Sequence, residues 1–196
     1  FQLDPDIVYL NHGSFGACPI PIFNERAKWQ LELEKQPVAF IQDRIFELID
    51  NSREKLSGYI NCHKDDIVYF PNPTTALNMV IRSLNLSEND EVLTTDHEYG
   101  ALDKTWNFIS RKRKCKYSAI DINLPVNESE IIQSFKDRIN NKTKVIFLSH
   151  ITSSTGLILP VEKICALAKG YNIITIIDGA HAPGHIDLDI ESLGVD

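Results

Sequence analysis

The sequence predicts an α/β protein with a mostly parallel, doubly wound sheet and helices on both of its faces. Short apolar runs rich in β-branched residues recur through the later part of the chain, as they do in strands buried on both faces of a parallel sheet. Segments with helical spacing of apolar residues separate these runs, and that alternation is typical of doubly wound sheets. The clearest run, residues 173–178, ends in the carboxylate of Asp178.

The composition is that of an ordinary globular protein. With 196 residues, the chain is long enough for one sizeable domain with its own core. Its 20 Lys and Arg against 27 Asp and Glu give a net charge of −7, which argues against nucleic acid as a partner. The four cysteines form no Cys-x-x-Cys pair, so reduced thiols in the cytoplasm fit best. No apolar run approaches the length of a membrane span, and we expect no membrane partner.

The first part of the chain, residues 1–60, is predicted to be an N-terminal segment with scaffold helices. A loop at residues 11–19 contains two glycines and a proline. Its small residues either let the backbone approach a ligand or serve a plain connector. Helical spacing of apolar residues follows in residues 21–36 and again in residues 38–61.

From residue 61 to residue 196, strands and helices alternate, and we interpret this part as one α/β domain. The expected strands are residues 67–70, 91–95, 116–120, 145–149 and 173–178. The expected helices are residues 74–86, 100–113, 127–140 and 160–169. Because the carboxyl ends of parallel strands meet at one edge of a sheet, the polar loops that follow the strands should gather there.

The loop after the first of these strands carries two threonines, Thr74 and Thr75, at the start of a helix. Free backbone N–H groups and two hydroxyls would form an anion site there, and phosphate is its usual occupant. The alternative is ordinary N-capping by a threonine. Neither Gly-x-Gly-x-x-Gly nor the Gly-Lys-Ser/Thr of a P-loop occurs.

The other strand ends carry groups that suit a flat ligand. Tyr99 would stack on a ring at a helix start, unless it is an ordinary core or surface tyrosine. A run of hydroxyls before Gly156 would donate hydrogen bonds to ligand oxygens, although polar loops are common. Asp178, followed closely by His181, is either a turn residue or a fixed negative charge aimed at a ligand. A phosphorylated, flat, nitrogen-bearing ligand would use all of these groups, and pyridoxal phosphate is such a ligand.

Five motifs occur in an order that is characteristic of one family. They are LNHGSFGACP at 10–19, NPTTA at 72–76, DHEYGA at 96–101, SHITSSTG at 149–156 and DGAHAPG at 178–184. Together they resemble the class V aminotransferase family of pyridoxal-phosphate enzymes of fold type I, in particular its isopenicillin N epimerase-like and cysteine desulfhydrase-like branch. The resemblance covers essentially the whole chain. It implies an N-terminal fragment in which residues 61–196 form an incomplete cofactor-binding large domain and the C-terminal small domain is absent.

The resemblance implies roles for three residues around the cofactor ring. Asp178 would pair with the pyridine nitrogen and keep it protonated, which makes the ring an electron sink. His181 would reach the phenolic oxygen, where cysteine desulfurases often carry Gln. Ser153 would lie near the same oxygen, where relatives often have Asn.

The resemblance also implies roles for the phosphate and stacking positions. Thr74 and Thr75 would hold the phosphate. Tyr99 would stack on the ring, where the desulfurases usually carry His, and His97 is the second candidate for that position.

On the substrate side, the resemblance implies that Gly13 and Ser14 border a small amino acid and that the protein is a homodimer. The reaction would be that of a C–S lyase, desulfurase or epimerase, with transamination as the family's further chemistry. The family forms its Schiff base through a lysine roughly two dozen residues past the aspartate. No lysine follows Asp178 in this sequence. We therefore expect residues 1–196 on their own to be inactive.

Two other functions fit parts of the sequence. A metal-dependent hydrolase would use Asp178, His181 and His185, since these residue types suit zinc. Pro183 and Gly184 lie between the histidines, however, so the pair is not expected to share one helical face. A non-catalytic binding module or pseudoenzyme is favoured only if the native chain ends at Asp196.

Overall fold

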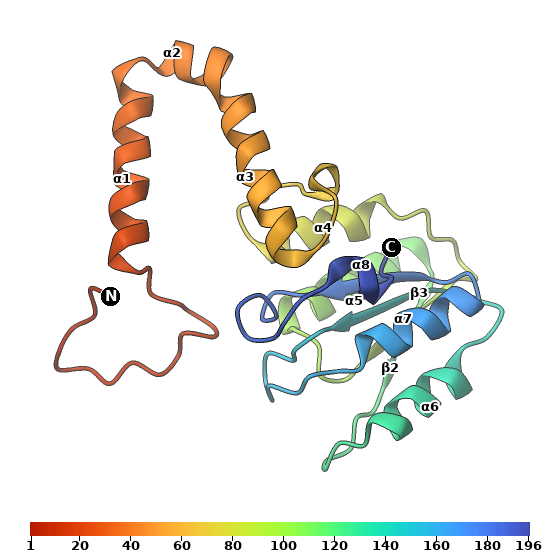
Figure 1. The fold of residues 1–196 in the computed structure, drawn as a ribbon. Helices are drawn as coiled ribbons and strands as arrows, with labels where there is room; N and C mark the ends of the chain where they lie inside the picture. The colour runs from red at the N-terminus through yellow and green to blue at the C-terminus, as the bar shows by residue number, and fades with distance from the viewer. The chain divides into compact units, whose positions relative to one another are not determined.

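The computed structural model describes residues 1–196, and the chain forms two compact units (Figure 1). The first unit comprises Phe1–Tyr59 with His63–Ile67, and the second comprises Ile60–Cys62 with Val68–Asp196. The role of residues 61–196 as part of a cofactor-binding domain stays a prediction. None of the helices combines the length and hydropathy needed to span a membrane.

The first unit is built around a helical hairpin. Its helices are α1 (Ile20–Lys35), α2 (Pro37–Ala39) and α3 (Ile45–Ile60), with a π-helical turn at Phe40–Arg44 and a 3₁₀ turn at Lys64–Asp66. The π turn interrupts the single helix expected for residues 38–61, and the backbone N of Ile45 donates to the carbonyl oxygen of Phe40. The Phe40 ring also contacts Trp29 of α1, with centroids 6.4 Å apart. Figure 1 shows α1 and α3 as the two arms of this hairpin, joined through α2.

The second unit contains a four-stranded, all-parallel sheet with the order β2-β1-β3-β4. The strands are β1 (Glu91–Thr95), β2 (Lys116–Ile120), β3 (Thr143–Ser149) and β4 (Ile174–Asp178). The helices are α4 (Pro73–Ser83), α5 (Gly100–Arg113), α6 (Glu128–Arg138), α7 (Val161–Gly170) and α8 (Ile190–Leu193). Strands β1 and β2 and helix α5 begin and end where the sequence predicts, whereas α8 was not expected.

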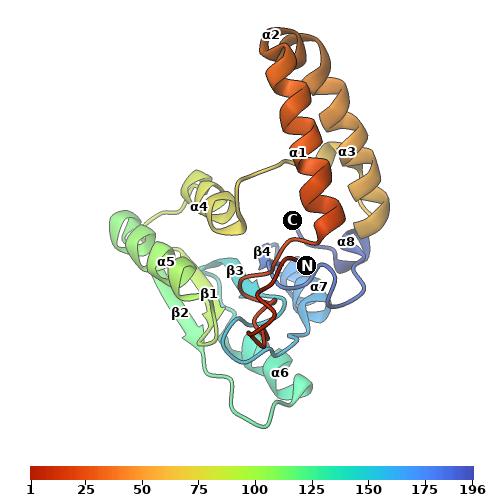
Figure 2. The same cartoon turned by 90° about the vertical axis from the view of Figure 1, so that its left-hand side faces the viewer.

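Helices cover both faces of this sheet, which confirms the predicted fold class (Figures 1 and 2). On one face, Trp106 of α5 and Ile81 of α4 pack against Phe147 of β3. On the other face, Phe135 of α6 and Ile164 of α7 belong to the core that contains the remaining apolar side chains of β1 and β3. The strand order reverses between β1 and β3, so this is the point where doubly wound folds hold their ligands.

The prediction of a strand at residues 67–70 is wrong, because this stretch pairs with no other strand. Val68 is 72% exposed, and Tyr69 and Phe70 are also exposed. Apolar and β-branched residues favour extended backbone, but a strand forms only where a neighbour exchanges ladder hydrogen bonds with it. The residue pattern alone carries no information about that neighbour.

Candidate functional site

Asp178 is the last residue of β4, and its carboxylate is buried at the carboxyl edge of the sheet. The residue is 5% exposed, and its Oδ1 accepts a hydrogen bond from the backbone N of Ala180 at 3.0 Å. In the register of β3 and β4, Asp178 lies opposite Ser149. Burial raises the pKa of Asp178, because the ionised carboxylate loses hydration there. A cationic or proton-donating group beside it would stabilise the ionised form.

A second carboxylate, Glu98, joins the end of β1 to the end of β3. Its Oε2 accepts hydrogen bonds from the backbone N and the Oγ of Ser149, at 2.8 and 2.7 Å. Its Oε1 accepts from Oγ1 of Thr95 at 2.5 Å. Burial raises the pKa of Glu98, and the negative charge of Asp178 raises it further. Glu98 was not predicted as a site residue, although the DHEYGA motif contains it.

Thr74 and Thr75 lie in the first turn of α4, but neither caps this helix. The N-cap is Asn72, whose Oδ1 accepts a hydrogen bond from the backbone N of Thr75 at 2.8 Å. Capping by a threonine, the alternative explanation of these residues, is therefore wrong. Neither threonine hydroxyl takes part in a hydrogen bond within the protein, so both are available to a ligand.

Helices α4 and α5 present their N-termini at the same end. Oγ1 of Thr105 in α5 donates to Oδ1 of Asn78 in α4 at 3.2 Å. One turn further along both helices, the Arg82 guanidinium lies 5.5 Å from the centroid of the Phe108 ring. Because the two contacts advance in the same chain direction, the helices run parallel. Two positive helix ends therefore lie near the carboxyl end of β1, an arrangement that favours an anion.

The two candidates for stacking on the ring differ in their exposure and in their hydrogen bonds. Tyr99 occupies the N-cap position of α5 and is 44% exposed. His97 is half-buried, and its Nδ1 is engaged with Oδ1 of Asp96 at 2.8 Å. The side chain of Tyr99 is therefore better placed to meet a ligand.

Ser153 lies at the tip of the turn that follows β3 and is exposed. The neighbouring hydroxyls hold this turn together, since Oγ1 of Thr152 bonds Oγ1 of Thr155 at 2.7 Å and accepts from the backbone N of Leu157 at 2.9 Å. In the hydroxyl run before Gly156, the threonines therefore stabilise the turn, whereas Ser153 is exposed.

His181 lies in the turn after β4 and is half-buried. Burial raises the pKa of Asp178, and the electrostatic influence of His181 opposes this rise. Nδ1 of His185 is bonded to the carbonyl oxygen of His181 at 2.5 Å. No group of three or more His, Cys, Asp or Glu side chains could hold a metal ion, so the hydrolase alternative gains no support.

Gly13 and Ser14 belong to the first unit, where both are exposed. Their predicted position beside a substrate stays a prediction. The other predicted residues surround the carboxyl edge of the sheet in the second unit.

This edge of the sheet combines two complementary features. Asp178 offers a buried negative charge, and the starts of α4 and α5 offer backbone dipoles and free hydroxyls to an anion. A ligand that carries both a protonated ring nitrogen and a phosphate fits the two features together.

Comparison with known proteins identifies the family. The model of "Aminotransferase class-V" matches residues 37–196, which is more than half of the chain. The chain belongs to the class-V aminotransferase family. Enzymes of this family depend on pyridoxal phosphate, as the sequence motifs predict.

Curated relatives with different reactions are similar to this chain. Isopenicillin N epimerase of Amycolatopsis lactamdurans is 32% identical over 201 residues, covering 100% of this chain and 50% of the relative. Hercynylcysteine sulfoxide lyase of Schizosaccharomyces pombe is 27% identical over 197 residues, with the same coverage of 100% and 50%. The chain thus spans about half the length of the curated relatives it matches.

A solved structure confirms the fold of this class-V family member. A mutant of C-DES with glycine covalently linked to its pyridoxal-phosphate cofactor superposes with a TM-score of 0.90 at 25% sequence identity. The match covers 98% of this chain and 51% of C-DES. The α/β fold with a parallel sheet is therefore that of a fold-type-I pyridoxal-phosphate enzyme.

Proposed function

We propose that this protein acts as a pyridoxal-phosphate-dependent enzyme on a small amino acid, as a C–S lyase, desulfurase or epimerase. The observation that carries the proposal is the buried Asp178 at the carboxyl end of β4, at the same edge of the sheet as the start of α5, which contacts the parallel α4. The similarity to an epimerase and to a sulfoxide lyase supports this range of reactions.

The residues of the second unit fit the cofactor. Asp178 would hold a proton on the pyridine nitrogen, and that positive nitrogen would in turn stabilise the buried carboxylate. The free hydroxyls of Thr74 and Thr75 would bind the phosphate at the start of α4. The exposed ring of Tyr99 would stack on the pyridine ring, because it lies at the neighbouring helix start.

His181 and Ser153 would bind the phenolic oxygen of the ring. The half-buried imidazole of His181 lies close enough to Asp178 to affect its pKa, and Ser153 presents an exposed hydroxyl from the turn after β3. Gly13 and Ser14 would border the amino acid. When bound, pyridoxal phosphate supplies an electron sink for the charge that develops at the α-carbon of the substrate.

The test is equilibrium dialysis of pyridoxal phosphate against the 196-residue chain. We expect saturable binding of one equivalent, which inorganic phosphate weakens by competing at the start of α4. Binding that does not saturate, or that phosphate leaves unchanged, would contradict the proposed phosphate site.

We further propose that residues 1–196 hold the cofactor without a covalent bond, since no lysine follows Asp178. After borohydride reduction, mass spectrometry should find only scattered labelling of surface lysines, and the chain should not turn over amino acids. Stoichiometric attachment at one lysine, together with turnover of cysteine, would overturn this expectation. The cytoplasmic location stays a prediction.

A further inference from the structure

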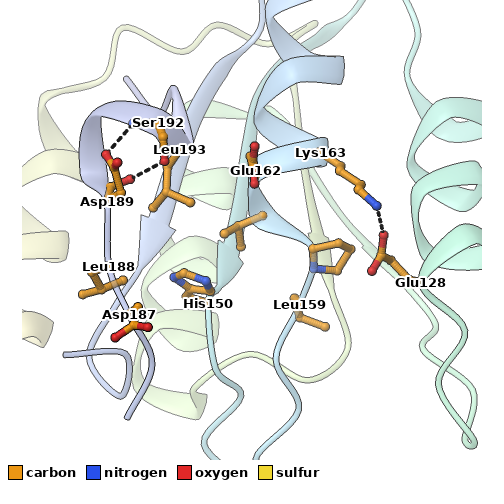
Figure 3. Close-up of a pocket in the computed structure, with 12 residues that line it drawn as sticks. Glu128, His150, Leu159, Glu162, Lys163, Asp187, Leu188, Asp189, Ser192 and Leu193 are labelled. Atoms are coloured by element: carbon orange, nitrogen blue, oxygen red, sulfur yellow. Dashed lines mark hydrogen bonds and ion pairs between the residues drawn. The ribbon is translucent and has the colours of Figure 1, made fainter. Parts of the chain in front are cut away.

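A second cleft lies on the opposite face of the sheet from Asp178. It has a volume of about 300 Å³, and we name it the His150 cleft after the residue at its base. Figure 3 shows His150 between the Asp187–Leu193 segment on one side and Leu159–Lys163 on the other. Side chains alternate along β3, so His150 follows Leu148 towards α7, whereas Ser149 faces Glu98. The cleft is therefore separate from the proposed cofactor site.

His150 is largely buried, and its imidazole lines the cleft without a hydrogen-bond partner in the protein. The residue is 7% exposed, and its backbone is fixed by hydrogen bonds to the carbonyl oxygen of Asp178 and from the backbone N of Leu159, both at 2.9 Å. Neither ring nitrogen bonds another protein group. Burial lowers the pKa of His150, which favours the neutral ring, and a neutral imidazole offers one lone pair as an acceptor. Because the ring lines the cleft, solvent or a ligand there can satisfy its nitrogens.

The walls of the His150 cleft are acidic. Glu162 at the start of α7 and Asp187 on the opposite side make no hydrogen bond or ion pair within the protein. Asp189 is already satisfied by the side chain of Asn61 at 2.8 Å and by the backbone N of Ser192 at 2.9 Å. Two carboxylates are thus free to attract a cation.

A basic residue reaches the cleft but is already paired. Lys163 forms an ion pair with Glu128, and Figure 3 shows this pair at the edge of the cleft. Lys163 also interacts electrostatically with the neighbouring Glu162, but less strongly than with Glu128. Between these groups, Leu159, Leu188 and Leu193 supply an apolar lining.

We propose that the His150 cleft binds the ammonium group of a small primary amine with a short carbon chain. The ammonium N–H would donate to the free ring nitrogen of His150, and Glu162 and Asp187 would balance its charge. The leucine side chains would receive the carbon chain. A cleft of this volume is at the small end of ligand pockets, which suits a ligand of a few heavy atoms. A metal ion is a poorer fit, because no three ligating side chains are grouped closely enough to hold one.

The test follows the imidazole signals of His150 by NMR while n-butylamine is added to the 196-residue chain at pH 7.5. We expect a saturable shift with the amine and none with n-butanol, which has the same chain but no positive charge. His150→Leu should weaken amine binding at least tenfold, and Glu162→Gln and Asp187→Asn each by about threefold, as for exposed charge pairs. Asp121→Asn, an exposed carboxylate after β2, is the matched control and should change nothing.

The proposal fails if n-butanol binds as well as n-butylamine, or if the affinity for the amine is unchanged in these variants. Should His150→Leu not fold, the Glu162→Gln and Asp187→Asn double variant decides, because both residues are exposed and unpaired. Asp178→Asn should leave amine binding unchanged. That control separates this cleft from the proposed cofactor site, since either site can fail without the other.

Discussion

At the scale of single residues, the carboxyl edge of the sheet carries the buried carboxylate of Asp178 and the half-buried carboxylate of Glu98. Buried carboxylates are costly unless a partner compensates them. Glu98 has its partners within the protein, in Ser149 and Thr95, whereas Asp178 accepts one backbone hydrogen bond. This difference explains why we assign Asp178 to a ligand and Glu98 to the alignment of β1 with β3.

The pH dependence of folding should reveal the buried state of Asp178. Its pKa is raised, so the folded protein keeps the proton to a higher pH than the unfolded chain does. The free energy of unfolding should therefore fall as the pH rises from the ordinary carboxyl range through the raised pKa. The free energy of unfolding of Asp178→Asn, measured by urea titration, should fall less between pH 4 and pH 7. An identical pH profile in both proteins would show that Asp178 is solvated.

Glu98 offers a prediction with an internal control. Glu98→Ala leaves the N–H and hydroxyl of Ser149 and the hydroxyl of Thr95 without their acceptor, which should cost about 1–3 kcal/mol. Glu98→Gln retains an oxygen acceptor and should cost clearly less in the same chemical denaturation experiment. Equal losses in the two variants would mean that packing, rather than these hydrogen bonds, accounts for the effect.

Asp178 could be predicted from the sequence, whereas the roles of Glu98 and His150 could not, for a physical reason. Asp178 ends an apolar run and stands before a glycine, so its position at a strand end is a local signal. The hydrogen bonds of Glu98 reach Ser149, which is 51 positions away in sequence, and no local pattern predicts them. His150 likewise reads as one member of a polar loop until the structure shows that the residue is largely buried.

At the scale of elements, the residue that caps α4 differs from the residues that we propose bind phosphate at its start. The threonines were expected either to bind phosphate or to cap the helix, but Asn72 performs the capping. Asn72→Ala should therefore destabilise the protein by about 1 kcal/mol, the typical cost of a lost cap.

Thr75→Ala should instead leave the unfolding free energy nearly unchanged and weaken pyridoxal-phosphate binding. Thermal denaturation and equilibrium dialysis of both variants check this pair of predictions. A Thr75→Ala variant that loses stability but keeps its cofactor affinity would restore the structural interpretation of this residue.

Strand pairing explains why most of the sheet could be predicted, whereas the structure of residues 67–70 could not. The central strand β3 is buried on both faces over residues 145–149, and its apolar run at 145–148 carries its own signal. Residues 67–70 have a similar composition, but pairing depends on a neighbouring strand that the local sequence does not contain. The π turn at Phe40–Arg44 was missed because its apolar spacing does not differ enough from that of an α-helix.

At the scale of the whole molecule, the first unit exposes many large apolar side chains, among them Ile22 at 61%, Leu31 at 64% and Phe46 at 75%. Exposed apolar surface of this kind often marks an interface. Together with the family resemblance, it supports the prediction that the protein is a homodimer. Sedimentation equilibrium should give twice the monomer mass. A protein that sediments as a monomer would contradict the prediction.

The central claim is that Asp178 holds the ring nitrogen of pyridoxal phosphate, and 4-deoxypyridoxine 5′-phosphate tests it most directly. This analogue keeps the ring nitrogen and the phosphate but lacks the aldehyde, so it cannot label lysines. Equilibrium dialysis should show one equivalent bound to the 196-residue chain. Asp178→Asn should weaken binding about 10- to 100-fold, the equivalent of one charged hydrogen bond, while Asp121→Asn should not affect it. Equal affinity of the wild-type chain and Asp178→Asn would contradict the assignment.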